Sequence, residues 1–392
     1  MIINLKKDIK SRILNGHPWI YSNEILNDVD VVDGDIVDVF YNKNFVGKGY
    51  YNSNSLIRIR LLTKKNETID FDFFKNKILR AKNYRESLLN FSDSYRLIFG
   101  EADGLPGLIV DKFNDYLVIQ VNTLGIFKYK FDILKALIEI FNPKGIYEKD
   151  DEKSSKIEGF DYYDRWVHGN GPDLLEFELN NIKFFSDLKG QKTGFFLDQR
   201  LNALNFMTFC KDKNVLDAFS YTGNFGIHAL CGGANHVTFV DFSERALEVL
   251  ELILKNNNIS SNRYDLIHSN AFDYLRMMDE SGKMFDITSI DPPSLAKSRK
   301  SKPNAFRGYK EINLRALKIT KNGGLLNTSS CTQIIYPEEF FKTIFEAAEN
   351  TNKSLKLINK GVQSPDHPVC TNIFETEYLK NYLFYVEDIN NY

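Results

Sequence analysis

Three carboxylates and one thiol each come at or near the end of a short apolar stretch in the second half of the sequence. They are Asp217, Asp241, Asp291 and Cys331. Carboxylates accept hydrogen bonds and exchange protons, and a cysteine thiolate is a strong nucleophile. Parallel strands end at one edge of a sheet, so residues that close several such strands surround one crevice. The pattern predicts a reaction site for a nucleotide-like ligand at that edge.

The first carboxylate belongs to the clearest motif of the chain, a strand followed by a glycine turn. Val215–Phe219 is expected to be the strand, and Gly223 and Gly226 form the turn before a helix. Glycine lets the backbone bend and come close to a ligand. The helix that follows offers unpaired N–H groups to an anionic group. We expect this turn to cradle part of the ligand.

Asp241 ends the next expected strand, where a carboxylate accepts hydrogen bonds from ribose hydroxyls. This arrangement fits a nicotinamide cofactor or S-adenosylmethionine. The full GxGxxG fingerprint is absent, and Asp217 suits a cationic amine better than a pyrophosphate, so we favour S-adenosylmethionine. Asn270 and Ala271, after the third strand, are expected near the adenine. The alternative is that these residues only cap turns.

The fourth expected strand ends in Asp291-Pro292-Pro293-Ser294. Two prolines fix an extended backbone, so we expect Asp291 to be held rigidly at the sheet edge. The loop that follows carries six cations and no acid, which suits a phosphate backbone; a solvated loop is the alternative. The six cations are Lys297, Arg299, Lys300, Lys302, Arg307 and Lys310.

Cys331 is the cysteine best placed for chemistry, because it follows the fifth expected strand of the same sheet. Its alternative role is simple packing. Cys210 and Cys231 lie in apolar helical segments and are expected to be core residues. Cys370 follows Asp366-His367-Pro368-Val369 in a loop for which a position facing the site stays open. The four cysteines show no CxxC spacing and no nearby histidine pair, so we expect neither a disulfide framework nor a metal site.

The elements that position these residues alternate between strand and helix over residues 176–392, which we take as one domain. Such alternation specifies a mostly parallel, doubly wound α/β sheet of the Rossmann-like class. The expected strands are 215–219, 237–241, 265–268, 287–291, 324–330, 355–359 and 379–386.

Two smaller domains are expected before this sheet. Residues 1–65 contain short alternating strands and predict a small β-barrel, while residues 66–175 predict a small central α+β domain. Arg58 and Arg60 alternate onto one strand face, which suits either phosphate contact or a solvated surface. The charged run 148–156 is expected to be a solvated loop.

Composition narrows the class of protein. A chain of 392 residues suits two or three domains, and a net charge of −2 argues against a generally basic nucleic-acid coat. A local basic patch is still compatible with RNA binding, because attraction to phosphate is local at physiological salt. Neither a long apolar run nor a signal-peptide pattern is found, so we expect a cytoplasmic protein that does not bind a membrane.

Several ordered motifs resemble the bacterial large-subunit (23S) rRNA methyltransferases that form 5-methylcytosine. The motifs similar to their N-terminal PUA domain and their central domain are Gly16-His17-Pro18-Trp19, Gly47-x-Gly49-Tyr50 and Gly100–Gly107. Those similar to their catalytic domain are Gln191–Arg200, the glycine turn, Asp291-Pro292-Pro293 and Ser330-Cys331-Thr332. The resemblance implies a class I methyltransferase fold, S-adenosylmethionine as cofactor and large-subunit rRNA as partner. It is also compatible with a homodimer.

The resemblance further implies roles for individual residues. Cys331 would add to C6 of cytosine, and Asp291 would bond the N3/N4 edge while C5 attacks the methyl sulfonium. The implied cofactor-binding residues are Asp198, Gln199, Arg200, Asp217, Phe219, Tyr221, Thr222, Gly223, Asp241, Phe242, Ser243, Asn270, Ala271 and Asp291. The RNA-binding candidates come from the basic loop and the arginine face of the strand instead, and they are Lys297, Arg299, Lys300, Arg307, Arg58 and Arg60. Asn270 stands where the family often has Asp.

Three other functions stay open at this point. A guanine N-methyltransferase of the same fold usually has an aromatic residue after Asp-Pro-Pro to stack the base, where this chain has Ser294. A dehydrogenase is disfavoured by the incomplete glycine fingerprint. An RNA-binding ribosome-assembly factor would keep the methyltransferase shell without methyl transfer.

Overall fold

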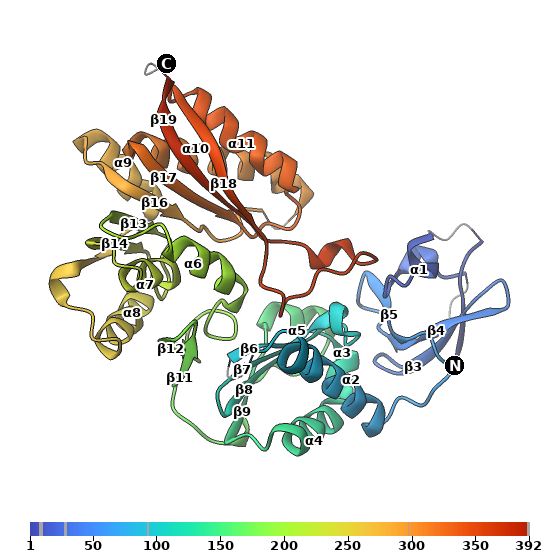
Figure 1. Cartoon of the computed structure of the whole chain (residues 1–392). Coiled ribbons are helices and arrows are strands. Elements are labelled where there is room, and N and C mark those ends of the chain that lie inside the picture. The colour runs from blue at the N-terminus through green and yellow to red at the C-terminus, as the bar shows by residue number, and fades with distance from the viewer. Residues whose placement is uncertain (8–10, 27–29, 92–93, 297, 390–392) are drawn as a thin grey trace. The chain divides into compact units, whose positions relative to one another are not determined.

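The computed structural model describes residues 1–7, 11–26, 30–91, 94–296 and 298–389 (Figure 1). The chain divides into two compact units. The first comprises Met1–Glu178, Ser186–Leu197 and Pro365–Thr376, and the second comprises Leu179–Phe185, Asp198–Ser364 and Glu377–Tyr392. The first unit therefore includes two segments that lie, in sequence, within the expected C-terminal domain 176–392.

A seven-stranded sheet with the order β15-β14-β13-β16-β17-β19-β18 forms the centre of the second unit. Strands β13 to β17 run parallel, and β19 runs antiparallel to both of its neighbours. The bounds are β13 (Asn214–Ala218), β14 (His236–Asp241), β15 (Tyr264–His268), β16 (Phe285–Ile290), β17 (Thr320–Ser330), β18 (Lys353–Gly361) and β19 (Lys380–Asp388). The predicted Rossmann-like α/β fold is confirmed.

Helices cover the two faces of this sheet. Helix α6 packs against α7, while α10 packs against α9 and α11 (Figure 1). The bounds are α6 (Arg200–Met207), α7 (Asn224–Cys231), α8 (Glu244–Asn256), α9 (Ala271–Ser281), α10 (Lys302–Ile319) and α11 (Pro337–Glu349). Helix α8 shows the local cause: Ser243 caps its first turn, and its buried residues recur at helical spacing from Ala246 to Leu254.

The first unit begins with a five-stranded sheet of order β1-β3-β4-β5-β2. Its apolar side chains alternate along the strands and form one core that includes Ile3, Val37, Val39 and Ile59. The bounds are β1 (Ile2–Asn4), α1 (Ser11–Leu14), β2 (Trp19–Tyr21), β3 (Ile36–Tyr41), β4 (Asn44–Tyr51) and β5 (Ile57–Thr63). This is the β-rich module that the alternating pattern predicts.

A second five-stranded sheet, of order β10-β9-β8-β7-β6, follows in the same unit. Its strands are β6 (Ser94–Phe99), β7 (Leu108–Phe113), β8 (Tyr116–Val121), β9 (Gly145–Lys149) and β10 (Asp164–Gly169). Its helices are α2 (Phe71–Asn83), α3 (Leu124–Lys128), α4 (Lys130–Phe141) and α5 (Glu152–Glu158). A separate hairpin is formed by β11 (Leu174–Leu179) and β12 (Ile182–Asp187). The mixture of helices and strands agrees with the predicted central α+β domain.

The charged run 148–156 is solvated only in part, and it is not a loop, because it ends β9 and begins α5; its exposed charged residues are Asp151, Glu152, Lys153 and Lys156. Glu148 is fully buried in β9 and accepts hydrogen bonds from Lys130 Nζ at 2.9 and 3.0 Å. Asp150 is also buried, and desolvation together with the charge of Glu148 raises the pKa of Asp150 to about 7. The interpretation failed because partners distant in sequence, such as Lys130, compensate the burial of these charges.

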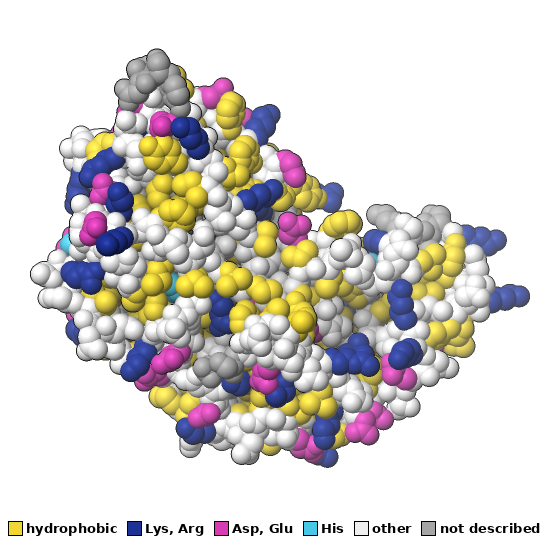
Figure 2. Space-filling model, in the orientation of Figure 1, with side chains coloured by type: hydrophobic (Ala, Val, Ile, Leu, Met, Phe, Trp, Pro, Cys, Tyr) yellow, Lys and Arg dark blue, Asp and Glu magenta, His cyan; other side chains and the backbone are white. Residues whose placement is uncertain are grey.

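Charged side chains of both signs are interspersed on the face that Figure 2 presents, in keeping with the net charge of −2. Within the described ranges, no helix combines the length and the apolar character that crossing a membrane requires.

Candidate functional site

Asp217 lies in β13 directly beneath the glycine turn. Its side chain is buried, and its Oδ2 accepts a hydrogen bond from the N–H of Gly226 at 2.8 Å. Desolvation raises the pKa of Asp217 to about 8, and the charges of Asp291 and Asp241 act in the same direction. A cationic group bound nearby would favour the ionised form of this carboxylate.

The two glycines of the turn are required by packing as well as by the backbone. A Cβ on Gly226 would lie 2.1 Å from Cε1 of Phe239, and one on Gly223 would lie 2.4 Å from Cδ1 of Leu250. Gly223 also has φ +82°, in the left-handed region. The turn therefore owes its glycines to close contact with β14 and with helix α8, a cause that the sequence interpretation did not include.

The loop between β13 and α7 contains further unusual conformations. Phe219 and Tyr221 have φ of 62° and 49°, which bulky residues seldom adopt. Such strain concentrates at functional sites, where the surrounding structure holds it in place. Within the part of the chain that the structure describes, the side-chain polar atoms of Ser220 and Asn224 are buried without a hydrogen-bond partner. Because buried polar groups are nearly always bonded, these atoms indicate a polar ligand in the loop.

Ser220 and Asn224 were missed at the sequence level. Asn224 is the first residue of α7, and a polar amide directly after the glycine turn was the available signal. Thr222, which was predicted, is buried in the same loop.

Asp241 joins β14 to the same turn. Its Oδ2 accepts from the N–H of Tyr221 and its Oδ1 from the N–H of Ser243, both at 2.8 Å. The carboxylate is half-buried, so its remaining lone pairs stay accessible to hydroxyls. Ser243 caps α8, and Phe242 is 75% exposed. Asp241 therefore holds the turn through two hydrogen bonds, and its carboxylate is still partly exposed to solvent.

Asn270 has a structural role at the start of α9. Its side chain accepts a hydrogen bond from the N–H of Phe272 at 2.9 Å and so caps the helix. This matches the capping alternative considered for the strand-end residues. Ala271 follows it and is buried.

Asp291, directly after β16, lies in a network with Gln199. The Nε2 of Gln199 donates to both carboxylate oxygens of Asp291 and to Oγ of Ser329, each at 3.2 Å. Asn202 in turn donates to Oε1 of Gln199 at 2.6 Å. Desolvation, with the charge of Asp198, raises the pKa of Asp291 to about 7. Asp291 therefore exchanges a proton near neutral pH, which suits general acid–base catalysis.

The predicted residues Asp198 and Arg200 flank Gln199. The hydroxyl of Tyr378 donates to Oδ2 of Asp198 at 2.5 Å, which fixes that carboxylate. Arg200 is buried at the start of α6, and its carbonyl accepts from Asn180 at 3.0 Å. The boundary between the two units falls within the Gln191–Arg200 motif, after Leu197.

Cys331 lies next to the Asp-Pro-Pro turn, with its Sγ 3.9 Å from the carbonyl oxygen of Pro292. Desolvation raises the pKa of Cys331 to about 12, and the charges of Asp291 and Asp198 add to this effect. Lys380 opposes it. The thiol is therefore protonated at neutral pH in the protein without ligand, and a thiolate requires a change in its surroundings.

Lys380 is a residue of this site that the sequence interpretation missed. It is the first residue of β19, it is buried, and its Nζ donates to the carbonyl oxygens of Thr332, Ile335 and Tyr378 at 2.8 to 2.9 Å. Desolvation lowers the pKa of Lys380 to about 8. The signal was a lysine at the start of a strand whose centre is apolar.

Thr332 connects the cysteine loop to the Asp-Pro-Pro loop. Its Oγ1 lies 2.7 Å from the hydroxyl of Tyr309 and 3.2 Å from Oγ of Ser294. The N–H of Leu295 donates to the same oxygen at 3.2 Å. Ser294 is therefore bonded within the protein between these two loops.

The remaining cysteines lie elsewhere. Cys210 is buried, as predicted, but Cys231 is exposed at the end of α7, so its assignment to the core was wrong. Cys370 lies in the first unit, with Sγ 3.9 Å from the carbonyl oxygen of Ala102, whereas Cys331 lies in the second.

The predicted RNA-binding cations have different environments. Arg299, Lys300 and Arg307 are exposed, whereas Lys302 and Lys310 form ion pairs with Glu339 and Glu346. Lys297 lies outside the described residues.

Arg58 and Arg60, from the first unit, also differ from each other. Arg58 is half-buried and donates to the carbonyl oxygen of Asn52 at 3.2 Å. Arg60 is buried and forms an ion pair with Glu158 at 3.1 Å. Its charge is therefore compensated within the protein by that of Glu158.

Comparison with known proteins adds sequence relatives along the whole chain. Residues 3–64 match the family described as PUA-like domain, and residues 199–315 match the family described as conserved hypothetical protein 95. Ribosomal RNA large subunit methyltransferase I of Pseudoalteromonas atlantica is 36% identical over 384 residues, covering 96% of this chain and 97% of the relative. Its counterpart in Aeromonas salmonicida is 36% identical over 387 residues, with 97% and 98% coverage.

Solved structures share the fold. A putative SAM-dependent methyltransferase from Streptococcus mutans superposes with a TM-score of 0.83 at 20% identity, covering 98% of this chain and all of the other. A putative methyltransferase complexed with SAH gives a TM-score of 0.83 at 21% identity, with 98% and 99% coverage.

Proposed function

Because the chain belongs to the ribosomal RNA large subunit methyltransferase I family, we propose that it transfers a methyl group from S-adenosylmethionine to C5 of a cytosine in large-subunit ribosomal RNA. The observation that carries the proposal is the placement of Asp217, Asp241, Asp291 and Cys331 at or next to the carboxyl ends of four parallel strands. This edge is where open α/β sheets bind nucleotide-like ligands.

The loop after β13 fits the polar parts of the cofactor. The buried polar atoms of Ser220 and Asn224 would bond its amino-acid end, and the half-buried Asp241 would accept from its ribose hydroxyls. Asp217 would be stabilised in its ionised form by the positive charge of the ligand. When bound, S-adenosylmethionine supplies a methyl group on a sulfonium, which is strongly electrophilic.

Cytosine C5 is a poor nucleophile, so the base must first be activated by addition of a thiolate. The sulfur of Cys331 would bond to C6 while Asp291 gives a proton to N3, and the π electron pair of the C5–C6 double bond would form the new bond from C5 to the methyl group. The bond from the sulfonium sulfur to that methyl group would break, and its electrons would stay on the sulfur, which leaves as a neutral thioether. Loss of the C5 proton to a general base, departure of the Cys331 thiolate and return of the N3 proton to Asp291 would restore the aromatic ring. A pKa of about 7 suits Asp291 to this proton transfer.

Ionisation of Cys331 is the most demanding step, because the pKa of its thiol is about 12. Burial is the largest cause, and the charges of Asp291 and Asp198 come next. A cationic ligand beside these carboxylates would offset their charges, and Lys380 already favours the thiolate. We therefore expect the thiolate to form only after S-adenosylmethionine and the target cytosine are bound.

The test uses large-subunit rRNA from cells that lack this gene. Wild-type protein with S-adenosylmethionine should convert one cytosine to a bisulfite-resistant form, and Cys331→Ala should not. RNA that contains 5-fluorocytosine should form a covalent adduct with the wild type alone, because fluorine at C5 blocks the final elimination. Methylation of cytosine by Cys331→Ala at the wild-type rate would refute the covalent mechanism.

One observation favours a second candidate, a guanine N-methyltransferase. The raised pKa of Cys331 is no obstacle to amino methylation, because that reaction requires no thiolate. In that case Cys331→Ala would keep most of its activity, and mass spectrometry of the digested RNA would find the added methyl group on guanosine.

A further inference from the structure

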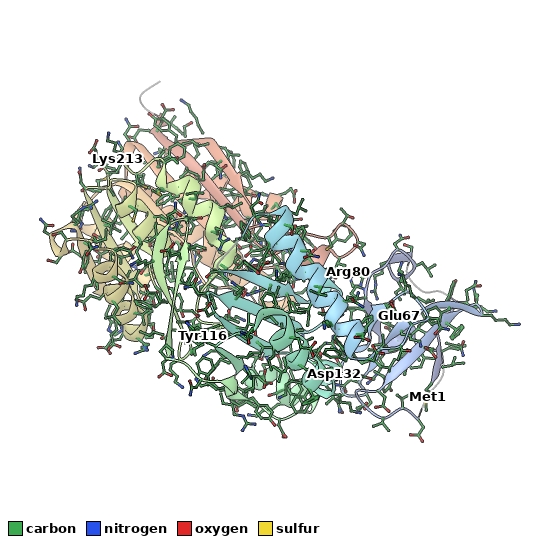
Figure 3. All side chains as sticks on the ribbon, turned by 60° about the horizontal axis from the view of Figure 1, so that its bottom comes forward. Met1, Glu67, Arg80, Tyr116, Asp132 and Lys213 are labelled. Carbon is green, nitrogen blue, oxygen red and sulfur yellow. The ribbon has the colours of Figure 1, made fainter. Side chains whose placement is uncertain are left out.

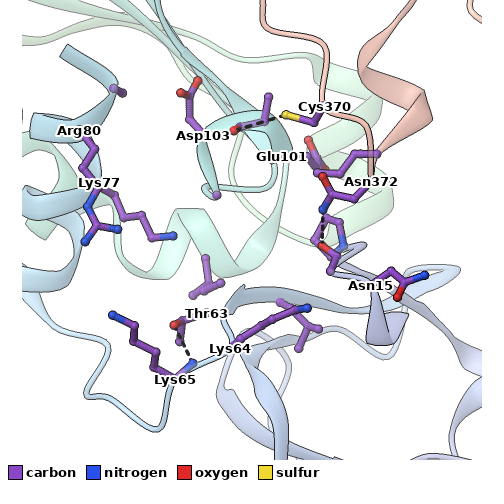
Figure 4. A pocket seen from close by; sticks show the side chains of 18 residues that line it. Asn15, Thr63, Lys64, Lys65, Lys77, Arg80, Glu101, Asp103, Cys370 and Asn372 are labelled. Atoms are coloured by element: carbon purple, nitrogen blue, oxygen red, sulfur yellow. Dashed lines mark hydrogen bonds between the residues drawn. The ribbon is translucent and has the colours of Figure 1, made fainter. Parts of the chain in front are cut away.

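The first unit contains a pocket of about 590 Å³ (Figure 4). Five parts of the chain form its wall: the turn at residues 15–18, the end of β5, helix α2, the turn Glu101–Gly104 and the segment around Asn372. Both the Gly16-His17-Pro18-Trp19 motif and the Gly100–Gly107 motif reach it. Its volume lies within the range of ligand pockets, roughly 300–1,000 Å³. Neither motif has a part in the methyl-transfer site.

Four cations line this pocket, and one of them, Lys77, also lies over the ring of Phe73, with its Nζ 5.4 Å from the ring centroid. They are Lys64, Lys65, Lys77 and Arg80. Among the described residues, none of the four forms an ion pair, although Lys64 donates to the carbonyl oxygen of Leu14 at 3.0 Å. Figure 4 shows Lys77 and Arg80 extending from α2, with Lys64 and Lys65 at the end of β5. Figure 3 labels Arg80, which lies in α2, and Glu67, which lies in the segment before that helix.

The acidic residues of the wall have partners of their own. Asp103 accepts from both Nη atoms of Arg85, at 2.7 and 2.8 Å, so its charge is compensated. Glu101 accepts from Nε1 of Trp19 at 2.9 Å. Just outside the lining, Glu67 accepts from Oγ1 of Thr63 at 2.5 Å. The pocket therefore keeps a surplus of positive charge.

Two glycines make room for the ammonium groups. A Cβ on Gly104 would lie 2.6 Å from Nζ of Lys77, and one on Gly16 would lie 3.2 Å from Nζ of Lys64. Burial lowers the pKa of Lys77, and the charge of Arg80 acts in the same direction. An anion in the pocket would relieve both the desolvation and this repulsion.

We propose that this pocket binds the phosphodiester backbone of a single-stranded segment of the RNA substrate, as a docking site in addition to the site of methyl transfer. The inference rests on the proposed function for the identity of the RNA. Unpaired Lys and Arg side chains in a concave site are what phosphate groups require, and this attraction is local, so a net charge of −2 does not oppose it.

The experiment measures binding of the full chain to a fluorescent single-stranded fragment of large-subunit rRNA over a range of salt concentrations. The variant is Lys77→Gln with Arg80→Gln. The control is Lys75→Gln with Lys82→Gln, which removes two charges from the same helix; both of these lysines form ion pairs, with Glu139 and Glu86. Lys65→Glu, at an exposed position, is a second probe that leaves α2 intact.

We expect the pocket variant to bind RNA at least tenfold more weakly at 0.1 M salt, with the slope of log K against log salt reduced by roughly 0.7 per lost phosphate contact. The control should bind like the wild type. Methyl transfer should show a raised KM for RNA with kcat unchanged, and calorimetric binding of S-adenosylmethionine should be unaffected. This pattern supports the docking site independently of the base that is methylated.

Two outcomes would overturn the proposal. In the first, both pocket variants bind RNA with the same affinity and the same salt slope as the control, and methyl transfer is intact. The proposed function would then stand without the docking site. The other is stabilisation of the wild type, but not of the variant, by millimolar inorganic phosphate while RNA affinity stays unchanged; the pocket would then be a site for free phosphate. Failure of the proposed function itself would appear instead as absence of methyl transfer by the wild type.

Discussion

Gln199 donates two hydrogen bonds to the carboxylate of Asp291, one to each oxygen at 3.2 Å. The first residue comes from the segment that enters α6 and the second follows β16, so two parts of the second unit meet at this contact. The amide opposes the effect of burial on Asp291, because hydrogen bonds to the charged form lower a carboxyl pKa. Gln199 therefore helps to keep the pKa of Asp291 near neutrality.

Gln199→Glu should move the pH profile of methyl transfer. The substitution removes the donor and places a second carboxylate beside Asp291, so the pKa of Asp291 should rise by roughly one unit or more. The limb of the kcat profile that reports Asp291 should move to higher pH by the same amount, and the melting temperature should fall, because Gln199 is buried and the substitution buries a second carboxyl group. Gln191→Glu, at an exposed position, is the matched control. An unchanged profile would show that Asp291 does not act through its proton.

Lys380→Met should reduce both stability and thiol reactivity. The substitution leaves three buried carbonyl groups without their charged donor, which should lower the free energy of unfolding by roughly 2 kcal/mol or more. Loss of the positive charge should also raise the pKa of Cys331, so alkylation of this thiol by iodoacetamide at pH 8 should slow several-fold. Lys360→Met, at an exposed position on β18, should change neither quantity. An unchanged alkylation rate in folded Lys380→Met would show that Lys380 does not influence the reactivity of the Cys331 thiol.

The parallel sheet could be predicted from the sequence because its strands are apolar runs separated by amphipathic helices, a pattern that depends on local residues only. The contacts that adjust the site are different in kind. Gln199 and Lys380 act through partners far along the chain, Asp291 and Thr332, and no spacing rule connects them. The positions of Asp217, Asp241 and Asp291 could be predicted from the sequence, because each falls at or next to a strand end. The topology of a parallel sheet alone places such residues near one another.

Single strands show the same limit. Alternation correctly predicted β5, but Arg60 lies opposite the buried Glu158 of α5, while Arg58 bonds to a nearby carbonyl group and lies over the ring of Tyr51. The pattern predicts which residues share a face of a strand, and the tertiary structure decides what covers that face. For the same reason the charged run 148–156 resembled a solvated loop.

Asp217 should make stability depend on pH. Its pKa is raised from 3.8 to about 8 in the folded protein, so between these values the folded state binds more protons than the unfolded state, and stability falls as pH rises. Asp217→Asn keeps an oxygen that can accept from Gly226, and it removes this dependence. The melting temperature of the wild type should therefore decline relative to Asp217→Asn between about pH 4 and pH 8.

The same variant tests the cofactor site. If Asp217 binds a cationic amine, Asp217→Asn should weaken the binding of S-adenosylmethionine at least tenfold in calorimetry. Equal affinity in both proteins would remove Asp217 from the cofactor site, and parallel melting curves across the pH range would show that its burial does not perturb its ionisation.

Gly226→Ala should destabilise the second unit, although alanine is normally the better helix residue by about 0.5–1 kcal/mol. The added Cβ would lie 2.1 Å from the ring of Phe239 and 2.9 Å from Oδ2 of Asp217, so α7 must move away from β13 and β14. Overpacking of this kind costs roughly 1–3 kcal/mol.

Gly308→Ala is the control, because that glycine is also helical and its Cβ would meet only the flexible end of Leu295, at 3.0 Å. Urea unfolding should find Gly308→Ala equal to or more stable than the wild type and Gly226→Ala less stable. Similar stability of the two variants would show that α7 yields to the extra methyl group, and that the glycine at position 226 is then required only by the ligand.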